Sequence, residues 1–183
     1  MPGAIAKEGQ DVTLRVLERE DLDLLQRNGA NPALRHLGGN AQVRDRSDLK
    51  SVFDHDDVTV FVVCLDDPGD PGPIDVDDVT RIGVANVGTW GRNPRLGIWL
   101  APAYHGEGYG RDAATQLVDY VFRSHETAKI EAKAFDFNEP SRGLLEAIGF
   151  TQEGCLRKDA YLDGELRDAY MYGMLREEWA NLW

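Results

Sequence analysis

A glycine-rich turn that leads into a striped helix is the feature of this sequence that most constrains its fold. Between residues 111 and 125, apolar residues recur with helical spacing at positions 113, 114, 117, 118, 121 and 122. Gly106, Gly108 and Gly110 precede this helix, and the stretch 95–100 before them is predicted to be a strand. Without a Cβ, several amide groups of such a turn can converge on one anion, and the helix N-terminus adds its own. We expect an anion-binding turn; the alternative is a tight turn without a ligand.

Two other glycine motifs do not match this turn. A P-loop requires Gly-Lys-Ser or Gly-Lys-Thr, whereas Gly110 is followed by Arg111 and Asp112. A dinucleotide-binding turn has the pattern G-x-G-x-x-G in a parallel unit, whereas here the third glycine comes one residue early. The strands before the turn also follow an antiparallel pattern, so both motifs are excluded.

The rest of the chain predicts an α+β fold. We expect helices over 18–27 and 47–53, a short helix that opens at Asn138, and strands over 12–16, 58–65, 81–87, 129–135, 150–158 and 167–175. Asp163-Gly164 predicts a hairpin between the last two strands. The order predicts a mixed, mainly antiparallel central sheet of about seven strands flanked by helices. We expect an N-terminal extension over 1–10, a single domain over 11–183 and a solvated Asp-rich loop over 66–78.

The charge of the chain restricts its partners. Of 183 residues, 20 are Lys or Arg and 32 are Asp or Glu, which gives a net charge of −12. So few cations disfavour nucleic acid as a partner. Attraction of cationic substrates could explain the acidity, but a surface adapted to high salt explains it better, because the excess of Asp and the scarcity of Lys extend over the whole chain. This explanation predicts activity that persists in molar KCl. No apolar run is long enough to span a membrane and no secretion signal is evident, so we expect a cytoplasmic protein.

Cysteine and histidine give no sign of a metal site. Cys64 and Cys155 lie far apart without a C-x-x-C pattern, and histidines 36, 55, 105 and 125 lack ligand spacing. We therefore expect no bound metal and no disulfide framework.

Three segments resemble one known family. Residues 96–113 are similar to the acetyl-CoA motif of the GNAT acetyltransferase superfamily, and residues 138–150 resemble the next block of that family. Residues 153–168 resemble the branch that contains ribosomal-protein-alanine N-acetyltransferases of the RimJ/RimL type. The resemblance extends from about residue 11 to 175. It implies acetyl-CoA as the co-substrate and a primary amine as the acceptor.

The resemblance also implies roles for individual residues. The pyrophosphate would rest on loop amides, here those of His105, Gly106, Glu107, Gly108, Tyr109, Gly110 and Arg111. The backbone of Ile98, Trp99 and Leu100 would pair with the pantetheine arm and polarise the thioester carbonyl. Asn138 and Ser141 match positions at the pantetheine end, and Ser141 is the first candidate to protonate the departing thiolate. A second explanation of Ser141 is that it caps its helix.

Three positions depart from the family pattern. His105 replaces the usual Arg or Gln, and Arg95 stands where branch members often have Glu. Leu145 stands where many members have a tyrosine that acts as the general acid. Without that tyrosine, the acid would be Ser141, Tyr104 or Tyr170. The base stays open between a water chain and three side chains, those of Glu131, Asp136 and His105.

The acceptor is the least defined part of the prediction. Aromatic residues that either line its pocket or belong to the core are Trp90, Trp99, Phe135 and Phe137. An acetyl-cysteine step through Cys155 is not expected, because no histidine adjoins it in sequence. We expect direct transfer to a primary amine, first of all a protein N-terminal amine. Alternatives are a polyamine or antibiotic acceptor and a catalytically weak acyl-CoA-binding module, in each case as a monomer or homodimer.

Overall fold

The computed structural model describes residues 3–38, 43–54, 57–65, 79–89 and 91–182. The expected acidic loop over 66–78, together with Trp90 and His55, lies outside the described residues.

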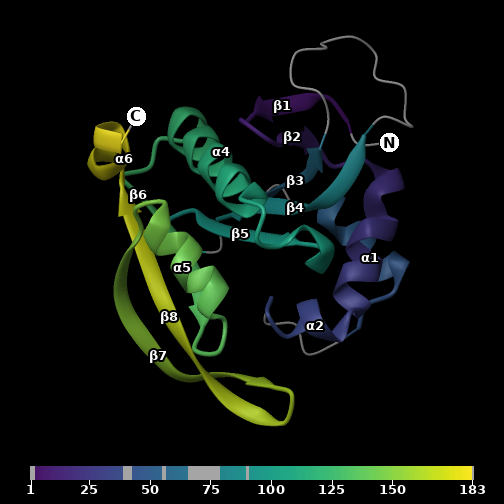
Figure 1. The fold of residues 1–183 in the computed structure, drawn as a ribbon. Helices are drawn as coiled ribbons and strands as arrows, with labels where there is room; N and C mark the ends of the chain where they lie inside the picture. Colours follow the sequence, from purple (N-terminus) through teal and green to yellow (C-terminus); the bar gives the residue numbers. More distant parts are fainter. Residues whose placement is uncertain (1–2, 39–42, 55–56, 66–78, 90, 183) are drawn as a thin grey trace.

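Within the described part of the chain, eight strands form one sheet in the order β1-β2-β3-β4-β5-β6-β8-β7 (Figure 1). All neighbours pair antiparallel except β5 and β6, which are parallel. The strands are β1 (Ile5–Glu8), β2 (Thr13–Val16), β3 (Val58–Leu65), β4 (Thr80–Gly88), β5 (Arg95–Leu100), β6 (Lys129–Phe135), β7 (Thr151–Leu162) and β8 (Glu165–Leu175). The predicted mixed, mainly antiparallel sheet is confirmed.

The strand beyond the expected number is β1, which lies inside the stretch 1–10 that we expect to be an extension. It pairs with β2 through Ile5↔Arg15, Lys7↔Leu14 and Glu8↔Thr13. At the other edge, β7 and β8 run longer than expected, because the turn at Asp163 and Gly164 keeps them paired up to Leu162↔Glu165. The predicted hairpin is confirmed.

The helices agree with the predicted ones in place but not in length. They are η1 (Arg19–Asp21), α1 (Leu22–Ala30), α2 (Pro32–Arg35), α3 (Arg46–Leu49), η2 (Lys50–Phe53), η4 (Pro102–Tyr104), α4 (Tyr109–Ser124), α5 (Glu139–Ala147) and α6 (Arg176–Leu182). The helix expected over 47–53 is split into α3 and η2, and the sequence pattern missed α6. No described helix has the length and apolar character needed to cross a membrane.

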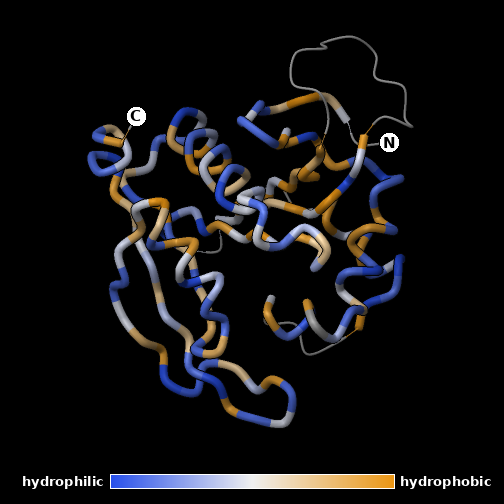
Figure 2. Tube along the Cα trace, viewed as in Figure 1, coloured by the Kyte–Doolittle hydropathy of each residue, from blue (hydrophilic) through white to orange (hydrophobic). Residues whose placement is uncertain are grey.

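The two faces of the sheet are covered by different helices. On one face, α4 buries the predicted stripe, including Leu117, Val118 and Phe122, against the central strands. α5 lies beside α4 on this face (Figure 1). On the other face, α1 and η2 pack against Val62 and Cys64 of β3. In Figure 2, β3 and β4 carry hydrophobic stretches, whereas hydrophilic and hydrophobic residues are mixed along β7.

Two aspartates of α4 attach this helix to the N-terminal strands. The Asp112 carboxylate accepts hydrogen bonds from the amides of Asp11 (2.7 Å) and Val12 (3.0 Å). Asp119 forms ion pairs with Lys7 of β1 and with Arg123. Desolvation raises the pKa of Asp119, but hydrogen bonds and charge from these cations outweigh it, so the pKa is lowered overall. The start of α4 is thereby fixed relative to the sheet.

Candidate active site

The parallel strands β5 and β6 pair over only part of their length. They pair at Arg95↔Glu131 and Leu96↔Ala132, and in the described residues no further β5–β6 pairing follows. β5 continues to Leu100 paired only with β4, and β6 continues to Phe135 paired only with β8. The two strands therefore have facing edges, here called the separated edges, that form no ladder with each other.

The direction of the backbone groups on β5 follows from its pairing with β4. The Ala101 N–H donates to the Ile82 carbonyl at 2.8 Å, which places the alternate residue Trp99 with its backbone groups toward β4. The backbone groups of Ile98 and Leu100 then point to the separated edge. Of the three β5 residues in the predicted pantetheine site, only these two present main-chain groups there.

The predicted glycine turn leads directly into α4. Gly106 and Gly108 have φ of 86° and 90°, in the left-handed region that favours glycine. Gly108 is the N-cap of α4, and its carbonyl accepts from the amides of Arg111 (2.9 Å) and Asp112 (3.1 Å). A Cβ at Gly106 or Gly108 would meet no described atom within 4 Å. Glycine is thus required at both positions by the backbone conformation, and the space above the turn is open.

The side chains of the turn connect it to its neighbours. His105 Nε2 lies 2.9 Å from the Leu100 carbonyl oxygen, which can only accept, so this nitrogen carries the proton. Arg111 Nη2 donates to the Ala147 carbonyl at 3.3 Å, near the end of α5. Glu107 is exposed. With Nε2 as the donor, Nδ1 is the His105 nitrogen that can accept a proton.

The structure assigns the cap of α5 to Asn138, so the explanation of Ser141 as the helix cap is wrong. Asn138 Oδ1 accepts from the Ser141 amide at 3.2 Å, and Ser141 lies in the third helical position. Within the described residues, neither the Ser141 hydroxyl nor the Asn138 Nδ2 forms a hydrogen bond, and both residues are half-buried. Both groups are therefore available as donors.

Gly110 brings the glycine turn, the end of β5 and α5 together. A Cβ at Gly110 would lie 3.6 Å from Leu100 Cδ1 and 3.9 Å from Leu144 Cδ2. Leu145, on the same helix, is buried in the core with Phe150, so the position where many family members have a tyrosine fills the core here. Tyr104 packs against the core cluster that contains Leu100.

Glu131 lies at the paired end of β5 and β6, away from the separated edges. Its carboxylate accepts from Asn93 Nδ2 (2.8 Å) and Arg95 Nη2 (3.4 Å), and Lys129 Nζ lies 3.8 Å away. Desolvation raises the pKa of Glu131, but these three groups outweigh it and lower the pKa overall. A carboxylate stabilised in this way is a poor proton acceptor.

The remaining candidates are partly engaged in structural contacts. Asp136 Oδ1 accepts from the Phe137 amide at 2.8 Å. The Arg142 guanidinium lies 4.6 Å from the centre of the Tyr170 ring. Cys155 is exposed, but local desolvation and the Asp168 carboxylate raise the pKa of its thiol, which disfavours the thiolate that an acetyl-cysteine step needs.

The aromatic residues expected near the acceptor separate into two groups. Phe135 and Phe137 stack on each other, with ring centres 5.7 Å apart, and belong to a small cluster at the hairpin end of the sheet. Trp99 instead lines a hollow of about 160 Å³ on the face of the sheet covered by α1 and α2. Arg35 and Arg44 line the same hollow. Sequence reasoning missed both arginines, because short helices and connecting segments carry no motif.

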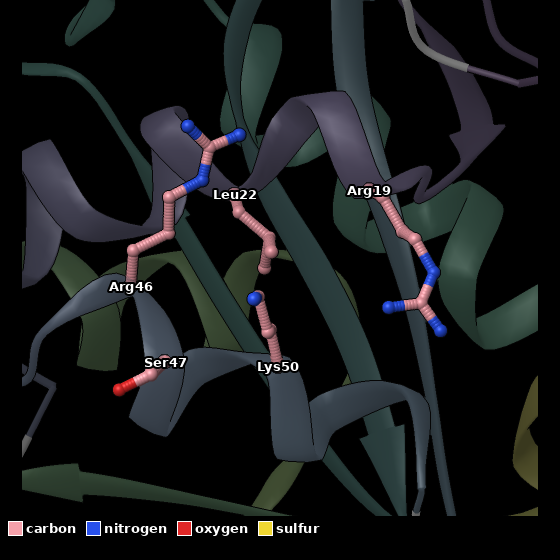
Figure 3. Close-up of a pocket in the computed structure, with 5 residues that line it drawn as sticks. All are labelled: Arg19, Leu22, Arg46, Ser47 and Lys50. Atoms are coloured by element: carbon pink, nitrogen blue, oxygen red, sulfur yellow. The ribbon is translucent and has the colours of Figure 1, made fainter.

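A larger hollow of about 510 Å³ lies elsewhere, between η1, α1, α3 and η2 (Figure 3). It is lined by Arg19, Leu22, Arg46, Ser47 and Lys50, none of which belongs to β5, the glycine turn or α5. In Figure 3 the Arg19 and Arg46 guanidinium groups point away from each other. This hollow is therefore separate from the candidate active site.

No group of three or more His, Cys, Asp or Glu side chains is placed to hold a metal ion in the ranges that the structure describes.

Comparison with known proteins agrees with this geometry. Residues 11–151 match the family model of the acetyltransferase (GNAT) domain. The chain is 28% identical over 178 residues to an uncharacterised N-acetyltransferase, p20, of Bacillus licheniformis, covering 93% of this chain and 96% of that protein. It is 29% identical over 112 residues to the ribosomal protein uS5 alanine N-acetyltransferase of Escherichia coli, covering 59% and 58% of the two chains.

Solved structures show the same fold. A spermidine N-acetyltransferase from Vibrio cholerae, in complex with CoA and spermine, matches with a TM-score of 0.80 at 23% identity, covering 93% of this chain and 99% of that chain. The family model spans most of the chain, and the predicted resemblance is confirmed. The chain therefore belongs to the GNAT acetyltransferase family and is an N-acetyltransferase.

Proposed function

We propose that this chain transfers the acetyl group of acetyl-CoA directly to a primary amine, with a peptide or protein N-terminal amine as the first-choice acceptor. The observation that carries the proposal is the position of the glycine turn beside the separated edges of β5 and β6. The glycine turn offers amides to an anion, and the separated edge of β5 offers strand groups that form no ladder with β6 to an extended arm. Both are needed to hold a long molecule with phosphates at one end.

The residues present fit the groups of CoA. The left-handed glycines and the first amides of α4 form a cradle for the pyrophosphate, with open space above it. Ile98 presents its N–H and carbonyl for the amides of the pantetheine arm, and Leu100 presents its N–H, because the Leu100 carbonyl already accepts from His105. Bound acetyl-CoA would supply the activated thioester, which is the chemistry that the protein's own side chains lack.

The chain's residues would then manage the protons. The amine must be neutral to form the new C–N bond as the C–S bond breaks, and the departing sulfur must gain a proton. Ser141 is the proposed donor to that sulfur because its hydroxyl has no partner within the described residues. Asn138 positions Ser141 through the cap and keeps Nδ2 free to donate. A water chain is the proposed route for the amine proton, because Asn93 and Arg95 hold the Glu131 carboxylate at the paired end of β5 and β6.

The choice of acceptor rests on the relatives. Ribosomal-protein alanine N-acetyltransferases support an N-terminal amine, and the spermidine enzyme with the same fold makes a polyamine the main competitor. The test is to mix the protein with acetyl-CoA and either peptides with N-terminal alanine, spermidine or an aminoglycoside, then follow CoA release and identify products by mass spectrometry. We expect peptide acetylation at the α-amine.

The outcomes separate the alternatives. If spermidine or the aminoglycoside were acetylated faster than the peptide, the proposed acceptor would be wrong and the proposed acetyl transfer would stand. CoA binding without CoA release from any amine would mean an acyl-CoA-binding module and would overturn the proposed reaction.

A further inference from the structure

The hollow beside Trp99 has an unexpected charge for so acidic a chain. Its described lining contains two cations, Arg35 and Arg44, and no carboxylate, although the chain carries a net charge of −12. A cationic acceptor would therefore meet only positive charge in this lining.

Neither arginine has a carboxylate partner among the residues that the structure describes. In the described parts of the chain no ion pair involves Arg35 or Arg44, whereas Arg81 contacts both Asp21 (3.0 Å) and Asp23 (3.1 Å). Arg35 Nε is buried and lacks a hydrogen-bond acceptor among the described residues, and its Nη2 lies 3.4 Å from His36 Nε2. A guanidinium with unused donors is suited to an anionic oxygen group, since its fork matches carboxylate or phosphate.

The hollow is joined to the proposed reaction site through Trp99. The Trp99 side chain lines the hollow, and its neighbours Ile98 and Leu100 present backbone groups at the separated edge of β5. The hollow and the separated edge thus share the short segment 98–100 of β5. An acceptor that carries both an amine and an anionic group has the chemistry that suits these two places.

Resting on the proposed function, we propose that the acceptor is a peptide N-terminus followed closely by an acidic side chain, whose carboxylate is held by Arg35 and Arg44. The same two cations exclude polyamines through like-charge repulsion, although the fold is shared with a spermidine enzyme. The arginines are specificity residues in this proposal and take no part in proton transfer.

The test measures binding separately from turnover. Isothermal titration of the CoA-loaded protein uses Ala-Glu-Ala-Ala-amide, Ala-Gln-Ala-Ala-amide and spermidine, so the two peptides differ only in one carboxylate. We expect the Glu peptide to bind about tenfold more tightly than the Gln peptide, a typical effect of a charge-assisted hydrogen bond. Spermidine is expected to bind more weakly than either.

Variants assign the preference to the arginines. Arg35→Gln and Arg44→Gln should each reduce the preference for the Glu peptide, and Arg35→Lys should retain part of it because the charge remains. Arg46→Gln is the matched control, since Arg46 lies in the other hollow, and should leave the preference unchanged. Arg44 is exposed, so Arg44→Gln carries the test if Arg35→Gln fails to fold.

CoA release from acetyl-CoA, followed in separate assays with the same three acceptors, distinguishes this inference from the proposed function. Preferential binding of the Glu peptide without CoA release would support the inference and overturn the proposed reaction. Equal binding and equal kcat/KM for the two peptides would overturn the inference and keep the reaction. Binding of neither peptide, or tightest binding of spermidine, would also overturn it.

Discussion

The two faces of the sheet at β5 offer different groups to a ligand: main-chain groups on one face and side chains on the other. On the face of α4 and α5, the proposed cofactor site is made largely of main-chain groups, set by two left-handed glycines and the start of a 16-residue helix. On the face of α1 and α2, the hollow beside Trp99 is lined by side chains from short elements. Main-chain recognition suits groups that every CoA molecule has, whereas side-chain recognition suits an acceptor that differs between enzymes.

Charge separates the same two regions. Residues 1–50, which supply α1, α2 and α3, contain eight basic and eight acidic residues, whereas residues 51–183 contain 12 basic and 24 acidic ones. The whole excess of −12 thus lies outside the segment that forms most of the hollow. The chain's acidity is therefore a poor guide to the charge of its acceptor.

The largest expected effect is on the cofactor face, where Ser141→Ala removes the proposed proton donor. We expect kcat to fall about 100-fold, at the lower end of the range for general acid catalysis, while the Kd for CoA changes by less than about twofold. Single-turnover rates and CoA titration measure the two quantities.

Ser51→Ala is the control for this change, because Ser51 Oγ donates to the Asp48 carbonyl far from β5 and its loss should leave kcat intact. An unchanged kcat in Ser141→Ala would transfer the acid role to Tyr104, Tyr170 or water.

The next effect, on CoA binding, comes from Gly108→Ala. The φ of 90° at Gly108 is strained for any residue with a Cβ, at a cost of about 1–2 kcal/mol, so the cradle should distort. We expect the Kd for CoA to rise about tenfold with little change in kcat at saturation. Gly154→Ala on β7, where a Cβ meets no described atom and φ is not positive, is the matched control. Unaltered CoA binding by Gly108→Ala would argue against the cradle.

The cofactor face could be predicted from the sequence, whereas the hollow on the other face could not. The strand, the glycine turn and α4 are continuous in the chain, so periodicity and glycine spacing were enough to place them. The hollow is assembled from residues between Leu25 and Trp99 by tertiary packing, and an unpaired arginine looks like any surface arginine in a sequence. β1 was missed for a similar reason: four residues are a strand only because they pair with β2.

Ser141 shows a smaller limit of sequence reasoning. Asn138 and Ser141 are both good N-cap residues, and the choice between them depends on where the helix starts. The helix starts at Glu139, so Asn138 takes the cap and the Ser141 hydroxyl is left for another role. A helix start three residues later would have made Ser141 the cap; with the observed start, its hydroxyl is available as a proton donor.

Asn138 provides a smaller effect that separates capping from donation. Asn138→Asp keeps the oxygen that caps α5 and removes the Nδ2 donor, whereas Asn138→Ala removes both. We expect Asn138→Ala to lower the free energy of unfolding by about 1 kcal/mol and Asn138→Asp to leave it nearly unchanged. If donation by Nδ2 matters, both variants should slow transfer to a similar extent. Full activity in Asn138→Asp would reduce Asn138 to a positioning residue.

The smallest effect is expected where β5 and β6 are still paired, at Glu131. A carboxyl group whose pKa is lowered on folding stabilises the protein above its unfolded pKa of about 4.3 and loses that contribution as the pH falls through the folded pKa. Glu131→Gln should therefore reduce the free energy of unfolding at pH 7 by about 1 kcal/mol or less, and the difference from the unmodified protein should shrink in acid. Denaturant titrations at pH 7 and pH 3 measure this difference. Because Glu131 lies away from the separated edges, Glu131→Gln should not change the pH dependence of kcat/KM. If the decrease of kcat/KM at low pH were lost in this variant, Glu131 would be the base and the reaction would take place at the paired end of β5 and β6.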